Sequence, residues 1–570
     1  MIDYRQAFDL APVGLVLSRN RTMVDCNQHV CDMFGATREQ LIGQSFQVLY
    51  PSADEYERTG ARIKLSLNAK GLYADDRLMK RIDGRLKGEP FWCHVTGRAL
   101  NLESPHEAGI WSFEDLSATR ENYVRTDWVM SDITVTTDAD QTPIAPGRQL
   151  SDETKNGRRT AHFVTSAPIH NFLSIQSARY KLTERTHDGV KLSIYHDPRH
   201  EWNVPAMLNA LEAGLDYFQS NFGPYQFDHA RIIEFPGYQS FAQAFAGTMP
   251  YSESIGFAAD VTDKDSIDYV TYITAHELAH QYWAHQVVGA DMQGQTVTSE
   301  TLAQYSALMV MKKLYGEDKI RRFLKYELDN YLGGRKGDAV GEQPLYRVEN
   351  QGYVHYRKGS LVMYLLQERL GEAAVNRALA RFIQTWKFKG APFHRSVDLI
   401  AELRKEATTP EQQALITDLF EKITIYDLKA KEAKTVKAAN GLWQTSITVE
   451  AAKYYADAKG NEKAAPLSEP IEIGLFNARP GVGAFGKKDV VSIERKPVKG
   501  GKQQIVVTSK AKPAFAGIDP VAVASRHAAR IGYHGDTLPS LHRHGQDSHA
   551  LRQPEGGAQG AAGSHTRGVQ

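Results

Sequence analysis

The sequence predicts a multi-domain protein of the α+β class, with both helices and strands. At roughly 150 residues per domain, its 570 residues correspond to about four domains. Apolar residues alternate at the strand period of two towards both ends, whereas helical spacing predominates from about residue 201 to residue 430. The apolar content of 42% is ordinary for a chain that buries hydrophobic cores. These observations indicate a helical central domain flanked by smaller domains that contain sheets.

Charge and composition exclude several classes of protein. The 68 Lys and Arg residues nearly equal the 67 Asp and Glu residues in number, so no basic surface for nucleic acid is expected. No apolar run approaches the roughly 18 residues that span a membrane, and the first residues (MIDYRQAFDLAP) do not form a signal peptide. We therefore expect a protein that has no membrane span, does not bind nucleic acid and acts in the cytoplasm.

Residues 1–122 are predicted to form the first domain, a small α/β unit. Val13–Leu17 and Thr22–Asn27 are short alternating runs separated by a polar turn, which is typical of a β-hairpin. Short helical segments follow the hairpin. A later pair of strands is expected at Phe91–Leu100 and Gly109–Leu116, where it would close the domain.

This first domain resembles a PAS sensory domain. The matching stretches are AFDLAPVGLVLSRNRTMVDCNQHVCDMFGATREQLIGQSF, FWCHVTGRAL and GIWSFEDLSATRE. The resemblance implies a sensor that binds a ligand in its core or mediates dimerisation. A homodimer formed through this domain is therefore one expected partner, and the residues do not identify a ligand.

A His-Glu-Leu-Ala-His motif at residues 276–280 carries the strongest chemical signal. Its surroundings, residues 265–286, have the apolar spacing of a helix. On a helix, His276 and His280 lie on one face, where both imidazoles can hold one zinc ion. Glu277 projects beside them and can act as a general base towards a water molecule. Because such a motif also arises by chance, the alternative is a helix with two ordinary polar histidines.

A metal site of this kind needs a third ligand, and Glu300 supplies one. Gly289 and Gly294 break the first helix, and residues 298–305 (TSETLAQY) then predict a second helix with Glu300 in its first turn. Two histidines and a glutamate would hold one zinc ion per chain and leave the fourth position to water. His285 is also near, but we expect it at the surface or beside the ligands rather than on the metal.

Residues from about 127 to 520 resemble the alanyl-aminopeptidase family of zinc metallopeptidases, which are gluzincins. The resemblance is closest to the branch fused to bacterial ABC-transporter permeases. The matching stretches are FGPYQFDHARIIEFPG, TAHELAHQYWAHQV, SETLAQYSALMVM and VHYRKGSLVMYLLQERLGE. The resemblance implies a thermolysin-like, mainly helical catalytic domain that acts on peptides. It also implies that His276, His280 and Glu300 are the zinc ligands and that Glu277 is the general base.

Tyr356 lies in the last of these stretches, within VHYRKG. The same match implies that its phenol stabilises the tetrahedral oxyanion of peptide hydrolysis. This role is chemically reasonable, because a phenol opposite the metal can donate a hydrogen bond to the developing charge. The alternative is a tyrosine that packs in the core.

Two departures from the family pattern bear on specificity. Nineteen residues separate His280 from Glu300, one more than in most of the family and the same as in thermolysin, so the spacing also allows an endopeptidase. The amine-recognition motif Gly-x-Met-Glu-Asn is replaced by GTMPYSE at residues 247–253, with Pro250 at the glutamate position. We expect Glu253 to provide the carboxylate that pairs with the N-terminal ammonium of a substrate.

Periodicity also predicts individual elements beyond the metal site. Amphipathic repeats predict helices at Met207–Phe218, Lys319–Leu332, Gly359–Leu370 and Ala373–Trp386. Period-two alternation predicts strands of a small β-sandwich at Thr445–Val449, Ile471–Leu475, Val490–Glu494 and Gln504–Thr508.

The remaining domain boundaries follow from composition. Strand-like runs before residue 200 resemble only the last strands of the family's N-terminal β-domain, and the PAS-like segment stands in place of the earlier ones. Gly, Ala, Gln and His accumulate at the C-terminus, which is typical of disorder. The expected domains are 1–122 (PAS), 123–200 (partial β-domain), 201–430 (catalytic), 431–440 (lysine-rich linker), 441–520 (β-sandwich) and 521–570 (disordered tail).

The leading hypothesis is a zinc-dependent aminopeptidase that removes N-terminal residues from peptides and carries a PAS sensor. One alternative is a thermolysin-like endopeptidase, which the altered amine-recognition motif allows. Another is a non-catalytic sensory or dimerisation protein that carries a truncated peptidase unit. Zinc content distinguishes the last hypothesis from the first two, and acetylation of the substrate's amine distinguishes the first from the second.

Overall fold

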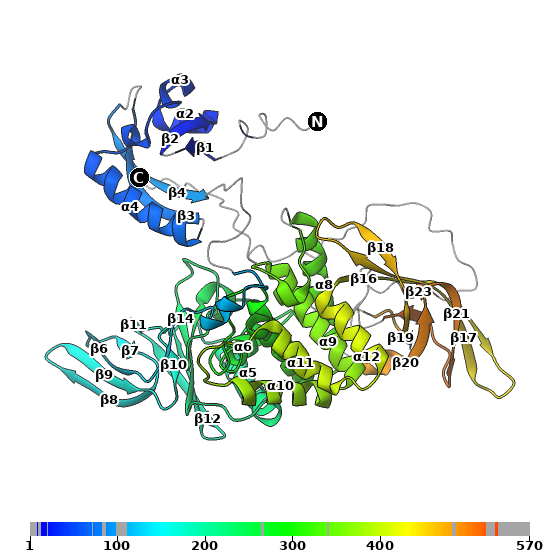
Figure 1. Ribbon diagram of the computed structural model, residues 1–570. Coiled ribbons are helices and arrows are strands. Elements are labelled where there is room, and N and C mark those ends of the chain that lie inside the picture. Colours follow the sequence, from blue (N-terminus) through cyan, green and yellow to red (C-terminus); the bar gives the residue numbers. More distant parts are fainter. Residues whose placement is uncertain are drawn as a thin grey trace. The chain divides into compact units, whose positions relative to one another are not determined.

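The chain divides into two compact units, Met1–Ile110 and Trp111–Gln570, in a computed structural model (Figure 1). Helices and sheets occur in both units, which agrees with the predicted multi-domain α+β class. Among the described residues, no helix is both long and apolar enough to cross a membrane. The structure describes residues 8, 13–19, 21–70, 72–82, 87–98, 111–263, 267–317, 319–338, 341–480, 486–519 and 531–533.

The N-terminal unit combines two hairpins with short helices. Strand β1 pairs with β2 and β3 with β4, both antiparallel. Its core is built around Met23, Cys26 and Leu41. Its elements are β1 (Val16–Arg19), β2 (Thr22–Cys26), α2 (Gln28–Phe34), α3 (Arg38–Leu41), η1 (Phe46–Leu49), α4 (Ala53–Lys70), β3 (Leu72–Lys80) and β4 (Pro90–Arg98).

The predicted strand at Gly109–Leu116 is wrong for its described part, residues 111–116. The strand β4, which was expected to pair with it, pairs with β3 instead. Trp111 begins the second unit, where it forms a β-bridge with Met292. Long-range backbone pairing of this kind leaves no signal in the local alternation of the sequence.

The second unit begins with a β-rich region. Strands β6, β9 and β8 form one antiparallel sheet, and a mixed sheet has the order β12-β13-β14-β15. In the mixed sheet, β14 runs parallel to both β13 and β15. The strands are β5 (Trp128–Val129), β6 (Asp132–Asp138), β7 (Thr142–Ile144), β8 (Arg148–Lys155), β9 (Arg158–Val164), β10 (Ile169–His170), β11 (Gln176–Ala178), β12 (Lys181–His187), β13 (Val190–His196), β14 (His229–Phe235) and β15 (Thr248–Ser252).

The mixed sheet crosses the predicted domain boundary at residue 200, since β12 and β13 precede it and β14 and β15 follow it. All seven residues of β14 are buried, as expected of a central strand covered on both faces. The strands before residue 200 therefore share a sheet with the segment that leads to the HELAH motif.

The helices of the second unit share one large hydrophobic core, and Figure 1 shows them, coloured green to yellow, packed side by side. The helices predicted from amphipathic repeats are present as α5, α8, α9 and α10. The helices are α5 (Val204–Asn221), α6 (Tyr269–Ala279), α7 (Leu302–Tyr315), α8 (Ile320–Gly337), α9 (Gly359–Leu370), α10 (Glu372–Trp386), α11 (Ser396–Glu406) and α12 (Pro410–Ile416).

Short helical turns connect these elements. The 3₁₀ turns are η2 (Leu116–Arg120), η5 (Leu345–Arg347) and η8 (Lys487–Asp489). The π-helical turns are η3 (Glu253–Phe257), η4 (Val297–Thr301), η6 (Tyr353–Lys358) and η7 (Thr417–Glu421). Helical turns with π geometry are rare and are often found at functional sites.

The C-terminal part holds two four-stranded sheets with a common core. Strands β16, β17, β18 and β21 form one sheet, and the other has the order β20-β19-β22-β23. The four strands predicted from alternation lie within β17, β19, β20 and β21. The strands are β16 (Ile423–Lys437), β17 (Trp443–Ala456), β18 (Glu462–Ala465), β19 (Ser468–Phe476), β20 (Val490–Lys499), β21 (Gly501–Ser509), β22 (Phe515–Ile518) and β23 (Ile531–Tyr533).

The predicted linker at residues 431–440 is wrong, because residues up to Lys437 belong to β16 and pair with β17. The pairing register shifts between Ala430 and Glu432, so Ala430 and Ala433 are both buried although they are three residues apart. A β-bulge of this kind interrupts period-two alternation. The lysines of this stretch up to Lys437 therefore belong to a paired strand and not to a linker.

The predicted disordered tail, residues 521–570, lies outside the described residues except for residues 531–533. These three residues form β23, which pairs with β22. The other domain boundaries stay predictions.

Candidate metal centre

Helix α6 positions the two histidines of the HELAH motif. The helix is shorter than predicted: it begins after its N-cap Asp268 and ends at Ala279, so His276 lies in its last turn and His280 is the C-cap residue. Their Nε2 atoms are 3.0 Å apart and the planes of the two rings are nearly perpendicular. Both side chains are buried. The expected arrangement of the two imidazoles on one face is therefore present.

A backbone carbonyl orients the ring of His280. Its Nδ1 lies 3.0 Å from the carbonyl oxygen of Trp283. Because a carbonyl only accepts hydrogen bonds, Nδ1 of the neutral ring carries the proton and Nε2 presents its lone pair to the site. This is the way in which metal-binding histidines are usually held.

Glu300 reaches the same point from η4, which continues directly into α7. Its Oε2 lies 3.4 Å from Nε2 of His276 and 3.2 Å from Nε2 of His280. Ligands of a tetrahedral zinc ion at about 2.0–2.1 Å are about 3.3 Å from one another. The three observed separations of 3.0–3.4 Å match this value. Glu300 Oε2 is also buried without a hydrogen-bond partner in the described part of the chain.

The charges around these atoms favour a cation. Burial would lower the pKa of His280, but Glu300 and Glu277 outweigh it and raise the pKa to about 9. Burial would raise the pKa of Glu300, but the two histidines hold it well below its ordinary range. An ionised carboxylate thus attracts positive charge to the point where the three donor atoms meet. The side chains therefore fit one zinc ion.

Glu277 lies beside this point and is only 6% exposed. Burial, with a contribution from Glu300, raises the pKa of Glu277 to about 7, although His280 and the backbone N–H of Ala244 lower it. A carboxyl group with a pKa near neutrality can both accept and return a proton at the pH of the cell. This position and environment suit the predicted general base.

Tyr356 comes from the π-helical turn η6, and its ring centroid lies 5.9 Å from that of His276. Burial and the nearby carboxylate of Glu300 raise the pKa of Tyr356 well above its ordinary value, so its hydroxyl stays protonated. The structure therefore brings Tyr356 together with the three candidate ligands and Glu277. A protonated phenol at this place can donate a hydrogen bond to an oxyanion.

Gly359 permits the close approach of η4 and η6 that unites Glu300 with Tyr356. A Cβ atom at this glycine would lie 2.5 Å from Oγ1 of Thr301, which is closer than side-chain carbons are found in proteins. The Thr301 hydroxyl donates a 2.5 Å hydrogen bond to the carbonyl oxygen of His355. This hydrogen bond joins the two turns directly.

Two family models match this chain. Residues 206–421 match the model described as peptidase family M1 domain, and residues 12–118 match a PAS domain. The chain carries a peptidase M1 domain and a PAS domain. His276, Glu277, His280, Glu300 and Tyr356 all lie in the M1 domain.

Relatives of the M1 domain are named aminopeptidases. Endoplasmic reticulum aminopeptidase 2 of Homo sapiens is 25% identical over 249 residues, which cover 42% of this chain and 26% of the human protein. Aminopeptidase M1-B of Oryza sativa subsp. japonica is 24% identical over 297 residues, which cover 48% of this chain and 33% of the rice protein. The chain thus spans about a quarter to a third of the length of these relatives.

The PAS domain has a relative of another kind. Sensor protein TdiS of Thauera aromatica is 30% identical over 114 residues, which cover 20% of each chain. Among solved structures, an M1 zinc metallopeptidase mutant from Deinococcus radiodurans aligns with a TM-score of 0.42 and 14% identity. That alignment covers 61% of this chain and 84% of the other.

Glu253 belongs to a cluster other than that of the three candidate metal ligands. It begins η3, directly after β15, and its Oε1 accepts a 2.7 Å hydrogen bond from the backbone N–H of Gly237. Its carboxylate groups with His200 and the buried Glu234, apart from the cluster of His276, His280 and Glu300. The structure therefore does not bring Glu253 into contact with the candidate metal ligands.

His285 is buried. It was expected either at the surface or beside the ligands, and the surface position is wrong. Its Nε2 lies 3.1 Å from the carbonyl oxygen of Ala244. The backbone of Ala244 in turn lies close enough to Glu277 to lower the pKa of that carboxyl group. His285 thus supports the segment that contacts the predicted general base.

Sequence reasoning missed Tyr123, which lies near the site from outside the M1 match. Burial and the nearby carboxylate of Glu300 raise the pKa of its hydroxyl. The residues around it have no motif that relates them to the HELAH helix, so only the fold shows this proximity.

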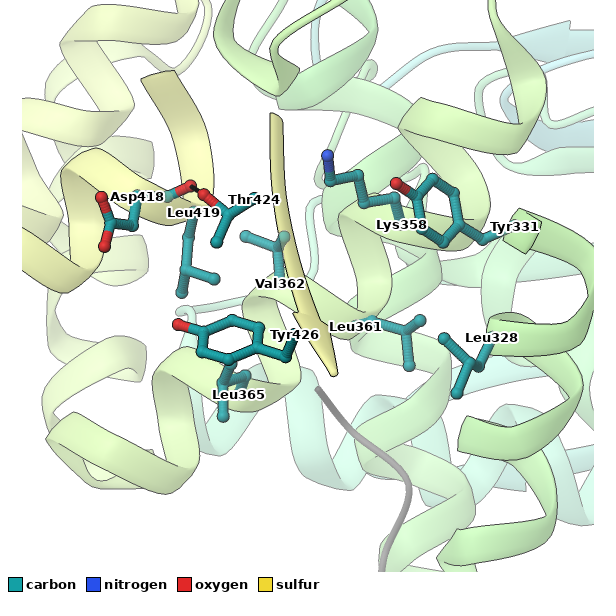
Figure 2. Close-up of a pocket in the computed structure, with 10 residues that line it drawn as sticks. All are labelled: Leu328, Tyr331, Lys358, Leu361, Val362, Leu365, Asp418, Leu419, Thr424 and Tyr426. Atoms are coloured by element: carbon teal, nitrogen blue, oxygen red, sulfur yellow. Dashed lines mark hydrogen bonds between the residues drawn. The ribbon is translucent and has the colours of Figure 1, made fainter. Parts of the chain in front are cut away.

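A separate cavity lies between the M1 helices and β16 (Figure 2). Its volume is about 50 Å³, which is room for water molecules but not for a peptide. None of the predicted site residues lines it, so it is not the substrate site. Its lining residues are Leu328, Tyr331, Lys358, Leu361, Val362, Leu365, Asp418, Leu419, Thr424 and Tyr426.

Proposed function

We propose that this protein is a zinc-dependent aminopeptidase that hydrolyses N-terminal residues from peptides. One zinc ion per chain is held by His276, His280 and Glu300. The observation that carries the proposal is the convergence of their three donor atoms at separations of 3.0–3.4 Å. The names of the relatives that match the M1 domain support the exopeptidase class.

A zinc ion in this site supplies a Lewis acid that polarises a carbonyl group and lowers the pKa of a water molecule. Glu277 accepts the proton of the attacking water and later delivers it to the leaving amine. Tyr356 donates a hydrogen bond to the oxygen on which negative charge develops. Burial of the Glu277 side chain excludes bulk water from it and strengthens these interactions.

Glu253 is proposed to bind the free N-terminal ammonium of the substrate. Its carboxylate directly follows β15 and is partly exposed, so a charged amine can reach it. Its separation from the ligand cluster is also the observation that favours the second candidate, an endopeptidase that does not read the N-terminus. Peptide substrates distinguish the two candidates.

The test uses purified, zinc-loaded protein and one peptide in free-amine and N-acetylated forms, with products followed by mass spectrometry. We expect stepwise loss of N-terminal residues from the free peptide and none from the acetylated one. Glu253→Gln is expected to weaken use of the free peptide by roughly 10- to 100-fold, the value of a charge-assisted hydrogen bond. Internal cleavage of both forms would instead identify an endopeptidase, and no cleavage of either by zinc-bound protein would support the sensory alternative.

Tyr356→Phe is expected to lower kcat about 100-fold with little change in KM, because the lost hydrogen bond forms mainly in the transition state. The ring packing next to His276 is retained in this variant. Steady-state kinetics with the free-amine peptide measure both constants. An unchanged kcat would show that Tyr356 only packs in the core.

The expected partner and location of the protein stay predictions. We propose that the protein forms a homodimer through the PAS domain and acts in the cytoplasm. The proposed peptide hydrolysis requires neither. Size measurement of the full chain in solution tests the dimer.

A further inference from the structure

One buried carboxylate, that of Glu327 on α8, joins the three elements that carry the candidate site. Helix α6 bears His276, the turn η4 bears Glu300 and continues into α7, and η6 bears Tyr356. Glu327 comes from a fourth element, and its side chain is completely buried. A buried carboxylate is costly unless donors surround it, so the identity of those donors is informative.

Each of the three elements contributes one donor to Glu327. The hydroxyl of Tyr272, on α6, donates a 3.1 Å hydrogen bond to Oε1, and Nε2 of Gln304, on α7, donates another of the same length. Nη1 of Arg357, on η6, lies 3.1 Å from this oxygen and 3.4 Å from Oε2. Burial raises the pKa of Glu327, whereas these three donors act to lower it. One carboxylate therefore binds α6, α7 and η6 at a single point.

On α6 and α7, the donors lie about one helical turn from candidate metal ligands. Tyr272 precedes His276 by four residues, so both side chains leave the same face of α6. Gln304 follows Glu300 by four residues, where η4 continues into α7. Because the backbone hydrogen bonds of a helix hold each turn to the next, a displacement of either donor also moves the ligand on its element.

On η6, the donor is adjacent to Tyr356 itself. Arg357 directly follows it, and Cζ of Arg357 also lies 5.2 Å from the centroid of the Tyr326 ring. Since Tyr326 precedes Glu327, two successive residues of α8 contact the same arginine. Neighbouring residues of a helical turn point in different directions, which lets Arg357 contact α8 while Tyr356 packs beside His276.

We propose that Glu327 is a positioning residue, which sets the candidate metal ligands and the hydroxyl of Tyr356 relative to one another. It acts through Tyr272, Gln304 and Arg357. This inference rests on the proposed function, because hydrolysis requires the metal and the oxyanion donor to meet the same carbonyl group. A misplacement of about 1 Å between such groups costs about 100-fold in rate.

Kinetics and zinc affinity of Glu327→Gln in the full chain test the proposal. The amide keeps the shape of the carboxyl group and removes its charge. We expect kcat for the free-amine peptide to fall about 10- to 100-fold with little change in KM, because the substrate still binds while the reacting groups are misplaced. Zinc affinity, measured by competition with a chromophoric chelator, should fall about 10-fold.

The matched control is Asp329→Asn, on the same helix. It removes a carboxylate from an exposed ion pair with Lys325, and it should keep wild-type kcat and zinc affinity.

A second variant separates positioning from a loss of stability. Glu327→Gln leaves the charge of Arg357 without its partner, which by itself destabilises the fold. The double variant Glu327→Gln with Arg357→Met removes both charges, and the amide can still accept hydrogen bonds from Tyr272 and Gln304. We expect this variant to have a thermal unfolding midpoint near that of the wild type and to keep the loss in kcat. In a Tyr356→Phe background, Glu327→Gln should lower kcat by a smaller factor, because no hydroxyl remains to be positioned.

Hydrogen exchange in zinc-free protein provides a readout that depends on neither metal nor activity. We expect faster exchange in α6, η4 and η6 of Glu327→Gln than in Asp329→Asn. Wild-type kcat and zinc affinity in Glu327→Gln would overturn the proposal, and so would full recovery of kcat in the double variant, because Glu327 would then serve stability alone. A wild-type protein that binds zinc but cleaves no peptide would overturn the proposed function, and zinc affinity and exchange of the variants would still decide this inference.

Discussion

Glu277→Gln is expected to lower kcat/KM for a free-amine peptide by about 10²–10⁴-fold, the usual contribution of general acid–base catalysis. The amide has the shape of the carboxyl group but cannot take a proton from water. The substitution therefore removes the proton-transfer function and leaves the packing around it.

The zinc content of the variant shows whether the loss of activity comes from the missing general base or from a missing metal ion. Glu277 is not one of the three converging donors, so the variant should retain wild-type zinc stoichiometry, measured by elemental analysis after gel filtration. Low activity with full zinc content would support the role as general base. Wild-type activity of Glu277→Gln would refute it, whatever the metal content.

The second large effect is expected for His280→Ala, which removes one of the three donors. Two ligands hold zinc far more weakly than three, and the metal supplies several kcal/mol of transition-state stabilisation, so activity should fall by at least about 10³-fold. Unlike Glu277→Gln, this variant should be purified without zinc. Metal analysis and peptide turnover on the same sample measure both effects.

A matched histidine on the surface provides the control for this variant. His162 pairs with Asp132 on the sheet β6-β9-β8 and is not part of the ligand cluster. His162→Ala should therefore keep both zinc and activity. Retention of zinc by His280→Ala would mean that other groups hold the metal and that the proposed ligand set is incorrect.

Local rules of helix geometry account for the part of the site that was predicted. His276 and His280 are four residues apart, and this spacing alone places both rings on one face of any α-helix. Glu277 lies beside them for the same reason. A second helical segment with Glu300 near its start was also expected, and Glu300 lies in η4, which leads into α7. The expected break at the glycines was wrong, because α6 already ends at Ala279.

Two other expectations were less successful, for different reasons. The lysine-rich stretch before Lys437 has the composition of a linker, yet it pairs with β17, the next strand in the chain. The bulge after Ala430 interrupts the alternation that would have marked this stretch as a strand. The strand expected at Gly109–Leu116 is wrong because Trp111 pairs with Met292, which lies far along the chain, so local alternation carried no information about it.

The sequence alone determined the chemistry of this protein: the HELAH spacing on one helix, a third ligand after a break and a composition without basic or membrane-spanning features. Only the tertiary structure decided what surrounds that chemistry. It placed Tyr356 beside Glu300 through the close approach of two π-helical turns at Gly359, and it separated Glu253 from the ligands. The physical reason is that helix periodicity acts over a few residues, whereas packing and backbone pairing between distant segments depend on the whole fold.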